Sequence, residues 1–182
     1  MAIATSERDT ARDAGTPDLR FRLLQQVCGS PTAGFWLAID RRTGKTCVVR
    51  VLDADREQSS RRLGELHRER TLAERIGHPG VLRLDVPLIE AERIFQVVDP
   101  EPARAIEPET EGGRLAVLNL LVGVASVLAD AHARGVFHGA FSAASCLRGG
   151  DGRVLVQGFT GDAASAAAVR DGAAADHRAF LD

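Results

Sequence analysis

The side chains that could take part in catalysis are few in this 182-residue sequence, and they lie far apart in the chain. His138 opens the segment HGAFSAAS (138–145), whose other residues are small, apolar or hydroxylic. Arg50 interrupts the apolar segment CVVRVL, Asp151 lies in the turn GGDG, and Asp162 follows farther along. An enzyme would need Arg50, Asp151 and Asp162 to converge on one site, and its chemistry would be a weak or atypical transfer reaction.

Cysteine usage and charge narrow the classes of function. Cys28, Cys47 and Cys146 form no CxxC pair and no Cys/His cluster, which argues against a structural zinc site, and their odd number argues against a full disulfide framework. Reduced thiols in a cytoplasmic setting are therefore expected. The formal net charge of -2 gives no overall basic surface, so nucleic acid is not expected as a partner.

No segment is expected to insert into a membrane. Residues 1–18 contain no long apolar run, so they are not expected to be a signal peptide. The most apolar segment, LAVLNLLVGVASVLA (115–129), is shorter than the ~20 residues that span a bilayer, and Arg114 and Asp130 bracket it. We expect this segment to be a buried helix.

The order of the expected elements indicates an α+β protein. Apolar residues at helical spacing predict a helix over 57–76, and a longer helix is expected over 114–134. The alanine-rich residues 163–175 give no pattern, and either disorder or a short helix is expected there. The expected regions are, in order, a flexible tail (1–20), a strand-rich region (21–98), a linker rich in Pro, Glu and Gly (99–113) and a helical region (114–182).

Three segments, in this order, resemble those of protein kinases, and the similarity runs from about Phe21 to Asp182. FRLL…FWLAIDRRTGKTCVVRVLD resembles the first three strands of the kinase N-lobe. HRERTLAERIGHPGVLRL resembles the αC helix and the turn after it, and VLADAHARGVFHG resembles the αE helix entering the catalytic loop. The resemblance implies a two-lobed kinase-like fold, with a five-stranded N-lobe that carries αC, a hinge over 99–113 and a partial helical C-lobe.

The glycine-rich loop of kinases is eroded in this sequence. In kinases the pattern GxGxxGxV lets backbone N–H groups approach the ATP phosphates closely. Cys28, Ser30 and Ala33 stand at the three glycine positions, Phe35 stands at the valine position, and Pro31 removes one N–H. We interpret the segment as an ordinary hairpin turn rather than a phosphate cradle.

The lysine of the third kinase strand and its αC glutamate correspond here to Arg50 and Glu69. A guanidinium is no substitute for lysine at a tight phosphate site, although it can pair bidentately with a carboxylate. We expect a structural Arg50–Glu69 ion pair that holds the helix. The alternative is that both side chains are merely solvated.

The catalytic base and the metal ligands of kinases are also replaced. His138 matches the histidine of the HRD motif, Ala140 stands for its aspartate, and Ser145 stands for the metal-binding asparagine. Gly158 stands for the aspartate of DFG, and Phe159 is retained. Alanine cannot accept a proton, and a hard cation needs several oxygen ligands. We therefore expect no bound metal, and a packed, structural role for His138.

The last segment, DHRAFLD (176–182), resembles the start of the kinase αF helix, with Asp176 at its buried anchor position. Only fifteen residues, 161–175, separate it from the segment GFT. That length is too short for an activation loop and a peptide platform. The chain would then stop inside αF, either because it is a fragment of a longer protein or because a partner covers the exposed core.

The combined replacements favour a pseudokinase, a regulatory module that binds a protein partner and transfers no phosphate. The first alternative is an ATP-binding switch without metal or catalysis, and the second is a weak, atypical serine/threonine kinase. The cleft of such a switch would be lined by Cys28, Ser30, Ala33, Val98, Asp99 and Glu101.

Among pseudokinases, the sequence is most similar to the cytoplasmic domain attached to MviN/MurJ-type lipid II flippases of actinobacteria. The shared features are the FRLL…FW opening, the eroded glycine loop and the short path to the αF start. This sequence differs in carrying no flippase helices. The resemblance implies a bacterial role in regulating cell-wall synthesis as the cytosolic part of a membrane-protein assembly, with a phosphothreonine-reading FHA domain as partner.

Overall fold

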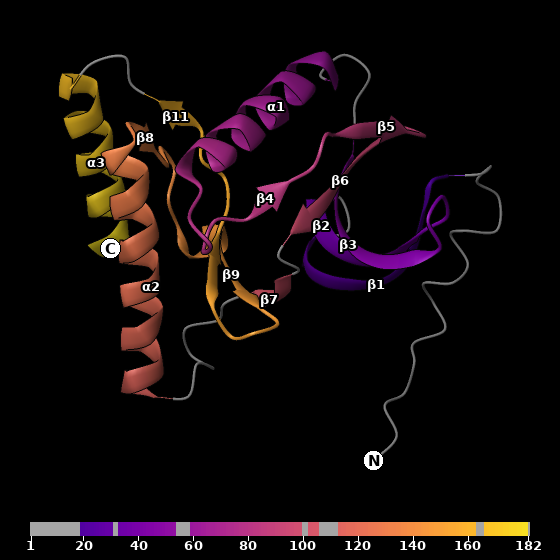
Figure 1. Cartoon of the computed structure of the whole chain (residues 1–182), viewed down its shortest axis with the longest axis horizontal. Coiled ribbons are helices and arrows are strands. Elements are labelled where there is room, and N and C mark those ends of the chain that lie inside the picture. The colour runs from indigo at the N-terminus through magenta and orange to yellow at the C-terminus, as the bar shows by residue number, and fades with distance from the viewer. Residues whose placement is uncertain are drawn as a thin grey trace.

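The structure of the protein, a computed structural model, is a mixed α+β fold of antiparallel sheets and three α-helices in its described part. The helices are α1 (Ser59–Ile76), α2 (Arg114–Ala133) and α3 (Ala166–Leu181). Figure 1 shows α2 and α3 at one end of the molecule, the main sheet at the other, and α1 above them. The described residues are 19–30, 33–53, 59–99, 102–105, 113–162 and 166–181. The expected flexible tail lies outside them, apart from its last two residues.

The main sheet has six strands rather than the expected five. Pro87 has no N–H to donate, and the Val86 N–H donates to Asp85 Oδ1 at 2.7 Å. This interruption divides one strand into β4 and β5, which both pair antiparallel with β6. The order is β1-β2-β3-β6-β4, with β5 also on β6. The strands are β1 (Phe21–Ser30), β2 (Ala33–Asp40), β3 (Lys45–Asp53), β4 (Arg83–Leu84), β5 (Leu88–Glu90) and β6 (Arg93–Asp99).

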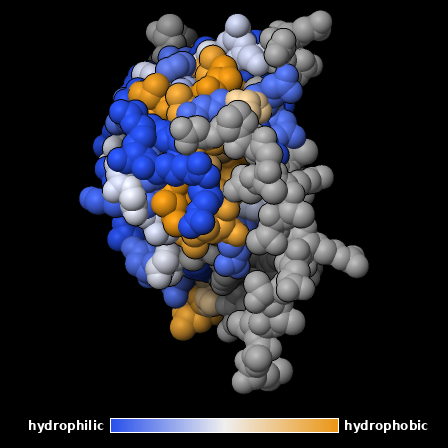
Figure 2. Space-filling view, turned by 90° about the vertical axis from the view of Figure 1, so that its right-hand side faces the viewer, coloured by the Kyte–Doolittle hydropathy of each residue, from blue (hydrophilic) through white to orange (hydrophobic). Residues whose placement is uncertain are grey.

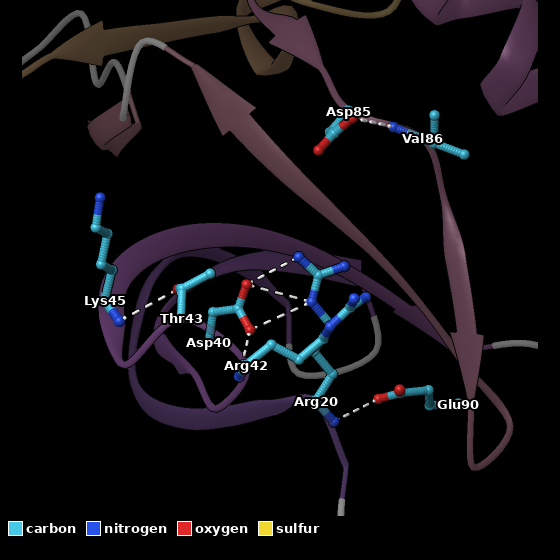
Figure 3. A network of polar contacts seen from close by, with 8 residues as sticks. All are labelled: Arg20, Asp40, Arg42, Thr43, Lys45, Asp85, Val86 and Glu90. Atoms are coloured by element: carbon cyan, nitrogen blue, oxygen red, sulfur yellow. Dashed lines mark hydrogen bonds and ion pairs between the residues drawn. The ribbon is translucent and has the colours of Figure 1, made fainter.

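Asp40 holds the β2–β3 turn to the start of β1 (Figure 3). Its Oδ2 accepts a hydrogen bond from Arg20 Nη2 at 2.8 Å, and its Oδ1 accepts one from the Arg42 N–H at 2.9 Å. The Arg20 N–H in turn donates to Glu90 Oε2 at 2.8 Å, which ties residue 20 to the end of β5. The hydrogen bond from Arg20 lowers the pKa of the Asp40 carboxyl.

The other described strands form two smaller sheets. One joins β7 (Pro102–Ala105), β9 (Cys146–Gly149) and β10 (Val154–Val156), and the other pairs β8 (Val136–Phe137) with β11 (Gly161–Asp162). Residues 102–105, which we expected in a linker, thus form a strand. Pro102 is tolerated because it is the first residue of a strand at the edge of its sheet.

The expected helix over 57–76 is present as α1, and its hydrophobic face packs into the core. It ends at Ile76, where Gly77 adopts a φ of 62°, a conformation that favours glycine after a helix. The buried residues of α1 are Leu66, Glu69, Leu72, Ala73 and Ile76.

The expectation that 115–129 is buried, within a helix over 114–134, is only partly correct. The helix forms, but Leu115, Leu118 and Val122 are exposed, because only the opposite face of α2 packs into the core. By length and composition α2 is also long and apolar enough to cross a membrane, which we did not expect. Its buried residues are Leu120, Val124, Val127, Leu128 and Ala131.

The alanine-rich region forms a longer helix than expected. α3 begins at Ala166, ten residues before Asp176, so Asp176 does not lie in the first turns of the helix. Alanine has the highest helix propensity of all residues, and it favours a helix even without hydrophobic periodicity. Residues 166–175 are therefore helical, and the alternative of disorder is wrong for them.

Candidate functional site

A cavity of about 470 Å³ lies between the β1–β2 hairpin, β3 and the segment 138–147. Most of the side chains that line it are small or apolar, and no described lining residue is a carboxylate. The lining residues are Cys28, Gly29, Ala33, Gly34, Phe35, Arg50, Leu52, His138, Ala140, Ala143, Ala144, Ser145, Cys146, Leu147, Gln157 and Gly158.

The hairpin over the cavity is closed by tight backbone contacts. Gly29 has a φ of +89°, and a Cβ at this position would lie 2.7 Å from Gly34 Cα. Ser30 Oγ accepts a hydrogen bond from the Ala33 N–H at 3.0 Å. Cys28 and Ala33 line the cavity, and burial raises the pKa of the Cys28 thiol, whereas Ser30 lies at the exposed turn. These contacts are those of a hairpin turn.

Arg50 and Glu69, which we expected to pair, lie within hydrogen-bond distance. Arg50 Nη1 is 2.8 Å from Glu69 Oε2, and the two side chains are 19% and 10% exposed. Glu69 Oε1 accepts a second hydrogen bond, from the Gly158 N–H at 2.9 Å. Glu69 therefore connects β3, α1 and the segment after β10 through its two carboxylate oxygens.

The Glu69–Gly158 bond does not follow from the sequence, because its two partners are 89 residues apart. The one available signal is the glycine itself. Gly158 has a φ of +86°, and a Cβ there would lie 3.5 Å from the His138 ring. A side chain would be strained in this backbone conformation.

His138 is a buried histidine whose ring nitrogens both have partners. Its Nε2 lies 2.7 Å from Gln157 O and its Nδ1 lies 3.4 Å from Ala140 N, so Nε2 carries the proton in this network. The ring also packs against Phe141 and Phe159, with centroids 5.3 Å and 5.1 Å away. Burial lowers the pKa of His138 and favours the neutral ring.

Ala140 and Ser145 offer the cavity little reactivity. Ala140 contributes only a methyl group. Ser145 Oγ accepts a hydrogen bond from the Ser142 N–H at 3.2 Å, and the Ser142 side chain accepts one from the Ser145 backbone. The Ser145 hydroxyl thus belongs to the short turn Ala143–Ser145.

Of the residues expected at the hinge, Val98 and Asp99 do not line the cavity. Val98 is 3% exposed and belongs to one packed cluster with Phe35 and Leu147, so its side chain is part of the core. Asp99 is exposed and pairs with Arg83 outside the cavity. Glu101 lies outside the described residues. Of the described residues that we expected to line the cleft, Cys28 and Ala33 line the cavity, and Ser30, Val98 and Asp99 do not.

The three groups that an enzyme would need to bring together are separated. Arg50 lines the cavity, but Asp151 accepts a hydrogen bond from the Arg153 N–H within its own turn, at 3.0 Å. Asp162 pairs instead with Arg68 of α1 at 2.5 Å. Among the described residues, no group of three or more His, Cys, Asp or Glu side chains is placed to hold a metal ion.

Asp176 of α3 holds the start of the segment that follows β8. It is 1% exposed, and its carboxylate accepts hydrogen bonds from the N–H groups of His138 at 2.6 Å and Gly139 at 2.8 Å. His132 Nε2 lies 3.0 Å from the same carboxylate. These contacts satisfy a buried charge and fix the backbone that positions His138 at the cavity.

Compared with known proteins, the chain matches no protein-family model and no curated protein. Its functional interpretation therefore rests on its own residues and on the geometry of the cavity.

Proposed function

We propose that this chain is a kinase-like, catalytically inactive module that acts by binding a protein partner. The order of the elements supports the kinase-like part. Three antiparallel strands precede α1, two more strand segments and β6 complete the sheet, and α2 leads into the segment at His138. In this frame Arg50 and Glu69 correspond to the kinase lysine and αC glutamate, and Asp176 corresponds to the αF anchor.

The observation that carries the inactive part is the chemistry of the cavity wall. Phosphoryl transfer depends on positioned charge, on a base for the attacking hydroxyl and on metal ligands. Ala140, Ser145 and Gly158 stand at the corresponding positions of the wall. They supply a methyl group, an engaged hydroxyl and a backbone N–H that Glu69 already binds.

Radiolabelled ATP with magnesium or manganese, together with generic protein substrates, tests this proposal. We expect no label in the substrates or in the chain itself. Label that disappears when Ala144→Trp fills the cavity would contradict the proposal, because the transfer would then depend on this site.

The setting that we propose is the bacterial cytoplasm, in the regulation of cell-wall synthesis, with an FHA domain as partner. Its support is the resemblance to flippase-associated pseudokinases, together with Cys28, Cys47 and Cys146, none of which forms a disulfide. Calorimetric titration of an FHA domain into the chain tests this proposal. Binding that requires prior threonine phosphorylation of the chain is expected, and no binding in either state would contradict the partner class.

The size of the cavity favours one second candidate, an ATP-binding switch without catalysis. A volume of about 470 Å³ lies within the range of small-molecule sites. Thermal unfolding with ATP, in the presence and absence of magnesium, separates the candidates, since a ligand at a hundredfold excess over its Kd stabilises the fold by about 2.7 kcal/mol. We expect no shift. A shift without magnesium would favour the switch, and a shift that needs magnesium would contradict our interpretation of the metal positions.

A further inference from the structure

The titratable groups that line the cavity are uncharged or paired at neutral pH. Burial raises the pKa of the Cys28 thiol, and it raises the pKa of Cys146 to about 12, so both thiols stay protonated. Burial also lowers the pKa of His138, which favours the neutral ring. Among the described lining residues, Arg50 is the one charged side chain, and Glu69 offsets its charge at 2.8 Å. The described wall therefore presents no unpaired charge to a ligand.

Most polar groups of the wall are already engaged within the protein. His138 Nε2 donates to Gln157 O at 2.7 Å, and Ser145 Oγ accepts a hydrogen bond from the Ser142 N–H at 3.2 Å. The side-chain amide of Gln157 is held less tightly, because its Nε2 lies 3.5 Å from Ala144 O, at the limit of a hydrogen bond. This amide therefore keeps its oxygen and an N–H for a ligand.

The rest of the wall is apolar and leaves the space open. Four alanines and three glycines line the cavity, beside the larger side chains of Leu52 and Leu147. Ala143 and Ala144 are also exposed, so the cavity opens to solvent beside them. Because Gln157 Nε2 is close to Ala144 O, the Gln157 amide lies near this opening. The cavity thus combines an apolar interior with one hydrogen-bonding group at its mouth.

A charged ligand would leave water for a wall that does not offset its charge. Burial of an ion is unfavourable unless an opposite charge or several hydrogen bonds meet it. Arg50 would meet an anion only by weakening its contact with Glu69, and no described lining residue is a carboxylate that would meet a cation. An uncharged apolar molecule leaves these contacts intact, and burial of its apolar surface stabilises the complex.

Other apolar surfaces of the protein enclose a small molecule less well. At the sheet end, Figure 2 shows hydrophobic residues only in small groups among hydrophilic ones. Helix α2 exposes Leu115, Leu118 and Val122, which are 72%, 55% and 68% exposed. A ligand on the surface of a helix is covered from one side, whereas the cavity covers it from the hairpin, from β3 and from the segment 138–147.

We propose that the cavity binds an uncharged, mainly apolar small molecule whose single hydrogen-bonding group meets the Gln157 amide at the opening. The volume of about 470 Å³ suits such a ligand. The inference goes beyond the protein-binding role proposed above, and it does not depend on the kinase-like interpretation. In a catalytically inactive module, this ligand would be bound without being converted.

The dye N-phenylnaphthylamine tests the class of ligand, because it is uncharged and apolar, has a single N–H, and fluoresces more strongly in apolar surroundings. We expect saturable binding at one site per chain. Anilinonaphthalene sulfonate has the same rings and one negative charge, and we expect its Kd to be at least about tenfold higher. Equal or tighter binding of the sulfonate, or no saturable binding of the uncharged dye, would overturn the proposal. Absence of dye binding would leave the proposed lack of phosphoryl transfer untouched, since radiolabelled ATP tests that separately.

Substitutions test whether the dye binds in the cavity. Ala144→Trp, which fills the opening, should weaken dye binding by at least about tenfold, and Ala143→Phe is a second filling variant with the same expected effect. Val122→Glu is the control, because it disrupts the exposed apolar surface of α2 and should leave dye binding unchanged. Binding that survives both filling variants, or that Val122→Glu abolishes, would overturn the assignment to the cavity. Far-UV circular dichroism checks that each variant folds.

Gln157→Leu tests the position of the hydrogen-bonding group. Loss of one neutral hydrogen bond should weaken binding of N-phenylnaphthylamine by about three- to tenfold. Benzylnaphthalene, in which a methylene group replaces the N–H, is the matched ligand, and its affinity should not fall in this variant. An equal loss of affinity for both ligands, or no loss for either, would overturn the assignment of the polar contact to Gln157.

Discussion

Glu69 is the residue on which the arrangement of the cavity depends most directly. One carboxylate oxygen binds Arg50 on β3 and the other binds the Gly158 N–H. The ion pair therefore orders the wall of the cavity, and it also occupies a cation that could otherwise bind an anionic ligand there. Arg50 and Glu69 can be matched from the sequence, but the bond to Gly158 requires tertiary proximity that no local pattern encodes.

Substitution of Glu69 tests this structural role. Glu69→Ala leaves the Arg50 guanidinium and the Gly158 N–H without their acceptors, and we expect a loss of about 3 kcal/mol in the free energy of unfolding. Glu65→Ala is the control one helical turn earlier, where an exposed pair with Arg61 contributes less than about 0.5 kcal/mol. Urea denaturation measures both changes. Equal losses in the free energy of unfolding for the two variants would show that the buried contacts of Glu69 stabilise the fold no more than the exposed pair of Glu65.

Asp40 is expected to make the free energy of unfolding depend on pH. Its pKa is lowered in the folded state by the hydrogen bond from Arg20, so its contribution is fully present above the unfolded pKa of about 3.9 and is lost as the pH falls through the folded pKa. Asp40→Asn should therefore destabilise the fold at pH 7 by about 1 to 2 kcal/mol. The difference in stability between Asp40→Asn and the wild type should shrink below about pH 4. Thermal unfolding of both proteins across pH 2.5–7 measures this difference, and a difference that is constant with pH would contradict the prediction.

At the level of elements, the hydrophobic pattern of the sequence was sufficient to predict some helices and strands but not others. Helix α1 follows from its apolar spacing, and α2 follows from its long apolar run, although composition could not show which face of α2 the fold would cover. The start of α3 lacks any contrast between apolar and polar positions, so only propensity pointed to a helix. Strand β7 lies in a segment whose Pro and Glu content is typical of a linker, and backbone pairing to β9 decides its structure.

Glycines in two helices are expected to respond oppositely to the same substitution. A Cβ on Gly172 of α3 would lie 2.4 Å from Phe137 Cγ, whereas a Cβ on Gly64 of α1 would meet nothing within 4 Å. Gly64→Ala should raise the free energy of unfolding by about 1 kcal/mol through helix propensity. Gly172→Ala should lower the free energy of unfolding by about 1 to 2 kcal/mol, because the cost of displacing the Phe137 ring exceeds the gain in helix propensity. Chemical denaturation of both variants is the measurement, and a change of the same sign in both would refute the packing argument.

At the level of the whole molecule, backbone and side-chain contacts join the sheet end to the helical end. Leu82 N–H donates to Val156 O at 2.9 Å, and Val156 N–H donates to Gly80 O at 2.7 Å. A hydrophobic cluster that contains Phe35 of β2 also contains Leu155 of β10. The sequence could not show that Val98 packs in one cluster with Phe35, because that depends on how the Phe35 ring packs.

The hydrogen bonds and the cluster that join the two ends predict that the molecule unfolds as one cooperative unit. Trp36, the one tryptophan, lies in β2 and reports on the main sheet, whereas far-UV circular dichroism reports mainly on the helices. The two signals should give the same urea midpoint. Leu155→Ala, at a residue that is 0% exposed in the shared cluster, should lower both midpoints together, with a loss of about 2 to 5 kcal/mol. Different urea midpoints for tryptophan fluorescence and for far-UV circular dichroism would contradict the prediction. The sheet end and the helical end would then unfold independently, and the shared cluster would contribute little to their coupling.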